Sequence, residues 1–300
     1  MDADDLIGRA RQFAAPYRVT RGKGFRLKDV DPGDTAGLGS GEKDRAKEVL
    51  RGGVEGLSRL QELLYAQDRW AVLLIFQAMD AAGKDGAIRH VMSGVNPQGC
   101  QVYSFKAPSS EDLDHDYLWR CLKSLPERGR IGIFNRSYYE EVLVVKVHRE
   151  LLAKQKIPPS LVKKNLWKQR YEDIRNVEQY LARNGVAICK FFLHVSKKEQ
   201  KRRFLERLDD DDKHWKFSEA DAREREYWDQ YMAAYEDMVR HTATPEAPWY
   251  VVPADNKWFT RLVVAAAAID TLAELGLEYP ELSREGQKEL AAARRQLLRT

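Results

Sequence analysis

Short apolar runs alternate with longer stretches of mixed polarity through most of the chain. The runs are apolar at successive positions, which is typical of strands that are buried on both faces. Strands separated by helices favour a parallel sheet covered by helices on both sides. We therefore expect an α/β fold with a parallel five-stranded sheet, whose strands lie at Trp70–Phe76, Gln101–Phe105, Ile131–Phe134, Val186–Val195 and Trp249–Val252.

The segments outside the strands predict an arm followed by a single domain. We expect residues 1–42 to form an N-terminal arm, because Pro16–Lys28 is basic and Asp31–Gly41 is rich in Gly and Asp. Residues 43–300 form the predicted domain, which ends in a C-terminal helix at 283–298. The other helices are expected at Lys43–Gln67, interrupted by Gly52–Gly53, and at Gly86–Val95, Ser110–Leu125, Tyr138–Val147 and Pro159–Asn184.

The turn Ala78–Lys84 has the features of a phosphate-binding loop. It follows the first strand and precedes a helix, so backbone N–H groups, the helix N-terminus and a lysine converge on one place. Compared with G-x-x-x-x-G-K-[ST], Ala78 replaces the first glycine and Asp85 replaces the Ser/Thr. Asp80 would repel phosphates unless a cation lay between them, so we interpret it as a magnesium ligand. An ordinary strand-to-helix turn is the alternative.

Asn135 and Arg136 follow the third predicted strand. A P-loop enzyme places the carboxylate that steadies magnesium at this point, and the amide of Asn135 is a neutral and weaker ligand. Arg136 would project at the carboxyl edge of the sheet, where ligands bind in open α/β folds. In the alternative interpretation Asn135 caps the helix at Tyr138 and Arg136 belongs to a surface ion pair.

A basic segment between Ser196 and Arg225 predicts a lid at about residues 207–225. A basic helix, a short polar hinge and a second basic segment are typical of a mobile lid that closes cations over phosphates. Trp215 and Phe217, placed among lysines, would anchor one face of it. The alternative is a solvated helix pair. The four consecutive residues Asp209–Asp212 repel one another, which favours a hinge or a helix end.

Composition and charge are typical of an intracellular enzyme. Of 300 residues 43% are hydrophobic, which is enough for a sizeable core. A net charge of +4 argues against a dedicated nucleic-acid-binding protein. Cys100, Cys121 and Cys189 form no C-x-x-C pair, so we expect buried reduced thiols. The N-terminus lacks a signal-peptide pattern and no apolar run is long enough to span a membrane, so we expect a cytoplasmic protein without a membrane partner.

Several motifs in order resemble the family-2 polyphosphate kinases, relatives of thymidylate kinase, over roughly Arg18–Leu272. Ala78 and Asn135 depart from the commonest family pattern and are similar to the class III subgroup, which implies phosphorylation of both AMP and ADP from polyphosphate. The shared motifs are Asp80–Gly86 (Walker A), Phe105–Ser109, His115–Arg120, Phe134–Tyr139 (Walker B) and a lid pattern from Arg207 through Trp215–Ser218 to Asp221 and Arg223.

The resemblance implies a P-loop kinase-like fold with a helical lid, and it implies roles for individual residues. Asp80, Lys84 and Arg136 would be catalytic, and Asp80 and Asn135 would hold Mg²⁺, or Mn²⁺ as a substitute. Lys106, Asn135, Arg136, Tyr139 and Glu140 would bind nucleotide. Polyphosphate would contact Ala81, Ala82, Gly83, Lys84, Asp85, Gly86, Arg203, Arg207, Lys213, Lys216 and Arg223.

The chemistry expected from the residues agrees with this resemblance. The chain has no G-x-S-x-G or H-E-x-x-H motif, and a phosphate acceptor needs no base because its terminal oxygens are already largely ionised near pH 7. The expected partners are inorganic polyphosphate, adenine or also guanine nucleotides, and further copies of the chain in a dimer or tetramer, without a specific nucleic acid. Two alternatives stay open: an ATP-dependent nucleotide or small-metabolite kinase, and a non-enzymatic nucleotide- or RNA-binding protein.

Replacing Lys213 and Lys216 together by Gln tests the lid. Cations along the path of a long polyanion contribute binding for each unit that they contact, and salt screens this contribution. The double variant should therefore raise the apparent KM for long polyphosphate and flatten its salt dependence, while nucleotide binding changes less. Steady-state kinetics at several salt concentrations measure this. An unchanged polyphosphate KM with weakened nucleotide binding would favour the ordinary nucleotide kinase.

Overall fold

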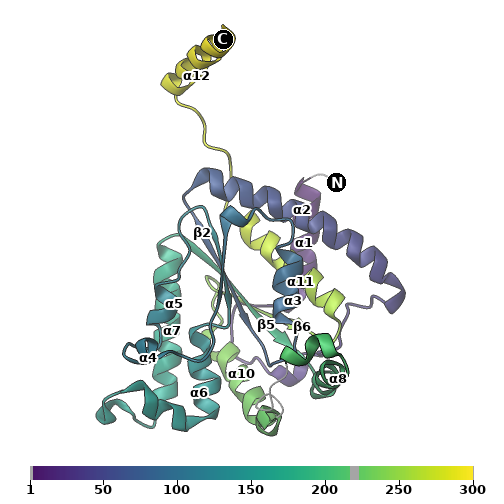
Figure 1. Ribbon diagram of the computed structural model, residues 1–300, viewed down its shortest axis with the longest axis vertical. Helices are drawn as coiled ribbons and strands as arrows, with labels where there is room; N and C mark the ends of the chain where they lie inside the picture. Colours follow the sequence, from purple (N-terminus) through teal and green to yellow (C-terminus); the bar gives the residue numbers. More distant parts are fainter. Residues whose placement is uncertain (1–2, 217–222, 300) are drawn as a thin grey trace.

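Six strands form one sheet at the centre of the computed structural model, which describes residues 3–216 and 223–299 (Figure 1). Their order across the sheet is β1-β6-β5-β2-β4-β3, so β2 is central. The strands are β1 (Arg18–Val19), β2 (Ala71–Gln77), β3 (Cys100–Ser104), β4 (Ile131–Asn135), β5 (Val186–His194) and β6 (Trp249–Pro253).

The prediction of a parallel sheet is confirmed for β2 to β6, but the predicted number of five strands is wrong. The sixth strand, β1, pairs antiparallel with β6 through Arg18 opposite Tyr250 and Val19 opposite Trp249, so the sheet is mixed. Two residues are too few to show a polarity pattern, which is why the sequence did not reveal this strand. The segment expected as an arm thus supplies an edge strand.

The register of β2 with its neighbours places the loops of the site together. Every residue of β2 is buried, because β4 and β5 flank it and helices cover its faces. Phe76 lies opposite Asn135 of β4 and Phe191 of β5, so these strands reach the same edge of the sheet. The backbone N–H of Arg136 donates to the carbonyl oxygen of Phe76 at 3.0 Å. The loop after β4 therefore lies beside the loop after β2.

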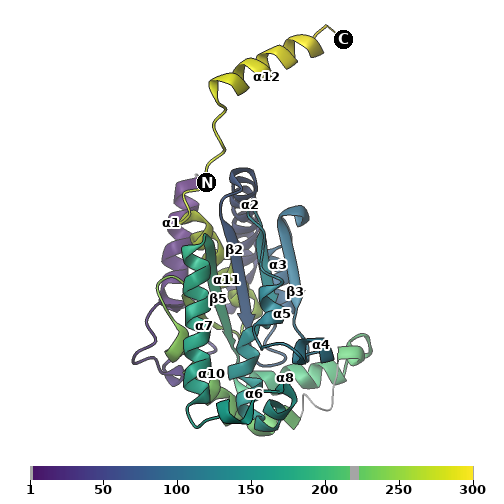
Figure 2. The same cartoon turned by 90° about the vertical axis from the view of Figure 1, so that its left-hand side faces the viewer.

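Helices cover both faces of the sheet (Figures 1 and 2). One face carries α1 (Ala3–Ala14), α2 (Lys43–Gln67), α3 (Lys84–Val91) and α11 (Lys257–Ala273), and the other carries α5 (Trp119–Leu122), α6 (Val144–Val147), α7 (Leu166–Arg183) and α10 (Trp228–Thr242). Two more helices, α4 (Ser110–Leu113) and α8 (Lys197–Leu208), lie near the carboxyl edge of the sheet. The 3₁₀ segments are η1 (Ala15–Tyr17), η2 (Leu27–Asp29), η3 (Ser40–Glu42), η4 (Pro97–Gly99), η5 (Tyr138–Val142), η6 (Arg149–Gln155), η7 (Pro159–Leu161), η8 (Asp211–Lys216) and η9 (Arg225–Tyr227).

Several helix boundaries differ from the sequence-based expectation. Helix α2 continues through Gly52–Gly53, where the sequence predicted an interruption. The helix expected at Ser110–Leu125 is two single turns, α4 and α5, and the chain between them contains Asp116, whose side chain accepts from the N–H of Leu118 at 2.9 Å. The predicted C-terminal helix is present as α12 (Arg284–Leu297) and extends away from the rest of the chain (Figure 2).

The expected lid is only partly within the described residues. Helix α8 ends at Leu208, where the aspartate run begins, and η8 and η9 follow. Residues 217–222, which include the predicted apolar anchor Phe217, lie outside the described residues. Within the described ranges, no helix is long and apolar enough to cross a membrane.

Candidate active site

The loop after β2 turns tightly onto the N-terminus of α3. Gly83 precedes the helix with φ 106°, and Ala81 adopts a left-handed φ of 63°, which is uncommon for a residue other than glycine. The Lys84 ammonium folds back and donates to the carbonyl oxygen of Ala78 at 2.7 Å. Burial lowers the pKa of Lys84, and the nearby carboxylate of Asp80 opposes this shift. A phosphate at this place would supply the counter-charge that burial demands.

Arg136 joins two carboxylates at the carboxyl edge of the sheet. Its guanidinium donates to Oδ1 of Asp80 at 2.7 Å and to Oε2 of Glu140 at 3.4 Å. Burial lowers the pKa of Arg136, but Glu140 and Asp80 outweigh burial and raise it above the ordinary value. Burial also raises the pKa of Glu140. Like Ala81, Arg136 has a left-handed backbone, with φ 65°.

Asn135 contacts the residue that replaces the usual Ser/Thr of the loop. Its amide nitrogen donates to Oδ1 of Asp85 at 2.7 Å. This contact fixes the amide so that its oxygen points away from Asp85 and is available as an acceptor. The two residues that depart from the common P-loop pattern, Asn135 and Asp85, are thus hydrogen-bonded to each other.

A cavity of about 870 Å³ lies over the loop and is strongly basic. Asp80–Gly86 form its floor, and Asn135 lies at its side. Its charged lining comprises eight cations, Lys84, Arg89, Lys106, Arg136, Arg203, Arg207, Lys257 and Arg261, and three carboxylates, Asp80, Asp85 and Glu206. This excess of positive charge fits a ligand with several negative charges.

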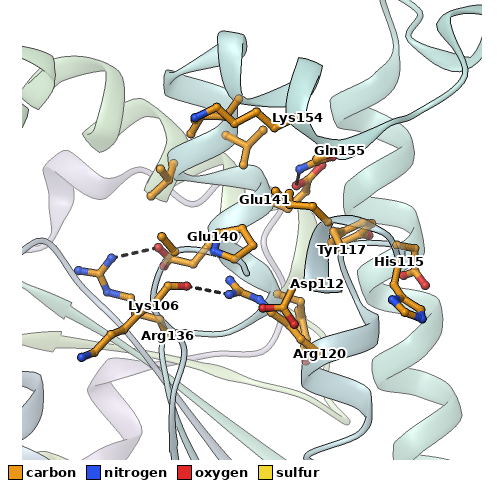
Figure 3. A pocket seen from close by; sticks show the side chains of 18 of the residues that line it. Lys106, Asp112, His115, Tyr117, Arg120, Arg136, Glu140, Glu141, Lys154 and Gln155 are labelled. Carbon is orange, nitrogen blue, oxygen red and sulfur yellow. Dashed lines mark hydrogen bonds and ion pairs between the residues drawn. The ribbon is translucent and has the colours of Figure 1, made fainter. Parts of the chain in front are cut away.

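A second cavity of about 380 Å³ lies on the other side of Arg136 (Figure 3). Figure 3 shows Lys106 and Arg136 at one end and Lys154 and Gln155 at the other. Its lining mixes charged groups with the apolar side chains Ala107, Pro108, Leu113, Val144, Val145 and Leu151. The hydroxyl of Tyr117, which also lines this cavity, is buried and has no hydrogen-bond partner in the part of the chain that the structure describes. Such a mixture fits a ligand with an apolar ring and a charged end.

The two cavities share Lys106 and Arg136 among their lining residues. The main chain of Lys106 is held by Arg120, whose guanidinium donates to its carbonyl oxygen at 2.7 Å (Figure 3). Ligands bound in the two cavities would thus meet at these two cations. A group could pass directly from one ligand to the other at this junction.

The structure brings most predicted site residues together, but Tyr139 and Arg223 line neither cavity. Tyr139, predicted to bind nucleotide, is 0% exposed and lines neither cavity. Its hydroxyl donates to Glu178 at 2.7 Å and accepts from Lys190 at 3.0 Å within the core. The buried ion pair of Glu178 and Lys190 needs these hydrogen-bond partners, so Tyr139 belongs to the core and not to the nucleotide site.

The residues predicted for the lid divide into three groups. Arg207 and Arg203 both line the large cavity, but Arg203 is buried and donates to the carbonyl oxygens of Ala81 and Ala82 at 3.0 and 2.8 Å. The backbone of Lys213 and Lys216 lies in η8, and their side chains are outside the described part. Arg223 is exposed and does not line either cavity.

Sequence reasoning missed three cations of the large cavity, Arg89, Lys257 and Arg261. Burial lowers the pKa of Arg261, and nearby Arg89 lowers it further. Burial also lowers the pKa of Lys257. A signal was present, because Lys257 and Arg261 begin the helix that follows β6 and lie one turn apart. The rule that pointed to Arg136, a polar residue just after a parallel strand, also applies to them.

Comparison with known proteins identifies the family. The sequence model of the family described as "Polyphosphate kinase 2" matches residues 40–278. The chain belongs to this family. It is therefore a phosphotransferase of the polyphosphate kinase type, as the sequence motifs predicted.

Individual relatives are similar over nearly their whole length. An ADP-polyphosphate phosphotransferase of Rhodopseudomonas palustris is 57% identical over 86% of this chain and 89% of the relative. An AMP/ADP-polyphosphate phosphotransferase of Meiothermus ruber is 45% identical over 91% of this chain and 97% of the relative. The crystal structure of polyphosphate kinase 2 from Arthrobacter aurescens superposes with a TM-score of 0.83, at 40% identity, over 94% of this chain and 96% of the other. This likeness confirms the P-loop kinase-like fold.

Replacing Lys84 by Met tests the loop. The ammonium would stabilise charge that develops on the transferred phosphoryl group, and loss of one such group typically lowers kcat by about 10² to 10³. Initial rates of phosphoryl transfer measure this. Lys288→Met, at an exposed lysine of α12, is the matched control and should keep the wild-type rate. Thermal unfolding must show a folded variant, and a near-wild-type rate in folded Lys84→Met would exclude the loop from the mechanism.

Proposed function

We propose that this protein transfers the terminal phosphoryl group of inorganic polyphosphate to AMP and to ADP, in a reversible reaction that requires Mg²⁺. The observation that carries the proposal is the junction of the two cavities at Lys106 and Arg136. The large basic cavity takes the donor chain, and the smaller mixed cavity takes the nucleotide. The two reacting phosphates then meet at the shared cations.

The lining of the large cavity supports polyphosphate as the donor. The cations Arg89, Lys257 and Arg261 line this cavity in addition to Lys84 and Arg136. Since burial lowers the pKa of Lys257 and Arg261, a polyanion that lies along them relieves an unfavourable concentration of positive charge. ATP carries only three phosphates followed by a nucleoside, whereas the many cations along this lining match a longer chain of phosphates.

The lining of the small cavity supports a nucleotide as the acceptor. Arg136 and Lys106 bind its phosphate end, and the apolar residues Val144 and Leu151 line the rest of the space, where a base can lie. The relatives differ in the acceptors that their names give, ADP alone in one case and AMP and ADP in the other. Ala78 and Asn135 resemble the class III pattern, so we assign both acceptors to this chain.

The loop residues fit a magnesium ion that is bound partly by the substrate. Mg²⁺ in phosphoryl-transfer sites takes one or two protein carboxylates and completes its coordination with phosphates and water. Asp80 and the amide oxygen of Asn135 supply oxygen donors at the cavity wall, and in the described ranges no cluster of three or more His, Cys, Asp or Glu competes for the metal. Bound there, the ion neutralises charge on the donor phosphates.

The proposed reaction needs alignment and charge neutralisation but no general base. An ionised oxygen of the acceptor phosphate attacks the terminal phosphorus of the chain, and the bridging P–O bond of that unit breaks. The leaving group is the polyphosphate shortened by one unit. Lys84 and the loop N–H groups hold the donor end, and Arg136 exchanges its contact with Asp80 for the acceptor phosphate. The negative charge that shifts between the acceptor and donor phosphates is therefore neutralised by Lys84 on one side and by Arg136 on the other.

Purified protein mixed with Mg²⁺, polyphosphate and AMP, without added ATP, tests the proposal. We expect ADP first and ATP later, because the product of the first transfer keeps the base and the phosphate end that the acceptor cavity binds. Anion-exchange chromatography separates the three nucleotides over time. A parallel reaction with ATP in place of polyphosphate, and AMP as acceptor, measures the competing nucleotide kinase activity.

Three outcomes discriminate among the candidates. Conversion of ADP with AMP untouched would overturn the assignment of both acceptors but keep the donor. Rapid transfer from ATP with none from polyphosphate would support an ordinary nucleotide kinase. Binding of nucleotide without any turnover, with different metal ions and polyphosphate chain lengths, would contradict the conclusion that the protein is an enzyme.

A further inference from the structure

Helix α8 holds the main chain of the phosphate-binding loop. The side chain of Gln200, which is 1% exposed, donates from its amide nitrogen to the carbonyl oxygen of Asp80 at 2.9 Å. Arg203, one turn further along the helix, donates to the carbonyl oxygens of Ala81 and Ala82. Three successive carbonyl groups of the loop are thus bound by two side chains of one helix.

Arg203 has no N–H group left for a phosphate. Besides its two contacts to the loop, it donates to the carbonyl oxygens of Ala254 and Asp255 at 2.6 and 3.0 Å, and its Nε donates to Glu199 at 2.7 Å. A guanidinium has five N–H donors, and these contacts use all of them. Arg203 therefore connects the loop after β2 with the segment after β6.

The hydrogen bonds from Gln200 and Arg203 reach the loop where its backbone is strained. Ala81 has a φ of 63°, a conformation that favours glycine, and such a residue persists only where its surroundings fix it. Gln200 and Arg203 hold the carbonyl groups on both sides of this residue. Without them, the peptide between Asp80 and Ala81 could rotate toward an ordinary conformation. That rotation would turn the carbonyl of Asp80 and the N–H of Ala81, one of the main-chain groups of the phosphate-binding loop.

Gln200 is itself held by the chain that follows the expected lid. Arg225, at the start of η9, donates to the amide oxygen of Gln200 at 2.5 Å and to the carbonyl oxygen of Lys197 at 3.3 Å. A carbonyl needs a donor and a guanidinium needs an acceptor, so the orientation of the Gln200 amide is fixed by both partners. The amide of Gln200 therefore connects η9 to the backbone of Asp80.

We propose that Gln200 is a positioning residue that fixes the backbone at Asp80 and couples it to the segment returning from the lid. This inference rests on the proposed function, in which Asp80 is the acidic group of the loop. Since coupling is reciprocal, a change in the position of η9 alters the main chain at Asp80, and a ligand that holds this part of the loop stabilises the position of η9.

Gln200→Leu removes both contacts and keeps an apolar side chain of similar length. We expect kcat to fall by roughly 10- to 100-fold, because small misplacements of reacting groups have effects of this size. The Mg²⁺ concentration for half-maximal rate should rise, and the KM for the nucleotide should change less than kcat. Lys201→Gln, on the exposed side of the same helix, is the matched control and should match wild type.

Two further measurements separate positioning from a loss of folding. Hydrogen exchange of the ligand-free protein should be faster at residues 78–86 in Gln200→Leu and unchanged in the central strands. Adding Ala81→Gly should reduce the effect of Gln200→Leu, since glycine adopts the left-handed conformation without a clamp. Gln200→Glu keeps the contact with Arg225 but places an oxygen against the carbonyl of Asp80, so it should resemble Gln200→Leu.

The inference would be overturned if hydrogen exchange at residues 78–86, kcat and the Mg²⁺ dependence were all the same in Gln200→Leu as in the wild-type protein. An equal fall in kcat caused by Gln200→Leu with and without Ala81→Gly would also overturn it, because it would show that Gln200 acts on something other than the strained peptide. The hydrogen-exchange result does not depend on the donor or acceptor. Failure of the proposed function would appear in the wild-type protein, and failure of this inference only in the comparison of variants.

Discussion

The ion pair between Arg136 and Asp80 is the contact on which the rest of the site depends. It exists because β2 and β4 are adjacent and end at the same level, with Phe76 opposite Asn135. Each partner belongs to the loop after one of these strands, and Arg136 lines both cavities. In the proposed reaction each partner exchanges this contact for another, a metal for Asp80 and a phosphate for Arg136. The two opposite charges therefore neutralise each other in this ion pair, and binding of a metal and a phosphate would separate them.

Much of this arrangement could be predicted from the sequence. Runs buried on both faces indicated the parallel strands, and the strand, loop, helix order around Lys84 located the phosphate site. The rule that ligands bind at the carboxyl edge of such a sheet then pointed to Arg136. Each of these features can be recognised from a short, continuous stretch of sequence, because it depends on one element and the loop beside it.

The features that the sequence did not reveal depend on contacts between distant segments. β1 is a strand only because β6 offers it an open edge, and Tyr139 is a core residue because Lys190 and Glu178 lie beside it. The sequence also places Arg203 among basic residues that resemble a phosphate-binding surface. Its burial under the loop, where it holds the carbonyl groups of Ala81 and Ala82 at a position whose backbone conformation favours glycine, is visible only in three dimensions.

One ligand can test directly whether the two cavities are the donor and acceptor halves of a single site. Adenosine 5′-pentaphosphate carries a nucleoside at one end and a phosphate chain at the other, so it should occupy both. Lys154 lines only the small cavity and Arg261 only the large one. Isothermal titration of the wild-type protein, Lys154→Gln and Arg261→Gln should therefore show that both substitutions weaken binding of this ligand. Binding of AMP should be weakened only by Lys154→Gln, and binding of polyphosphate only by Arg261→Gln. If neither substitution discriminates between AMP and polyphosphate, the two cavities are not separate donor and acceptor sites.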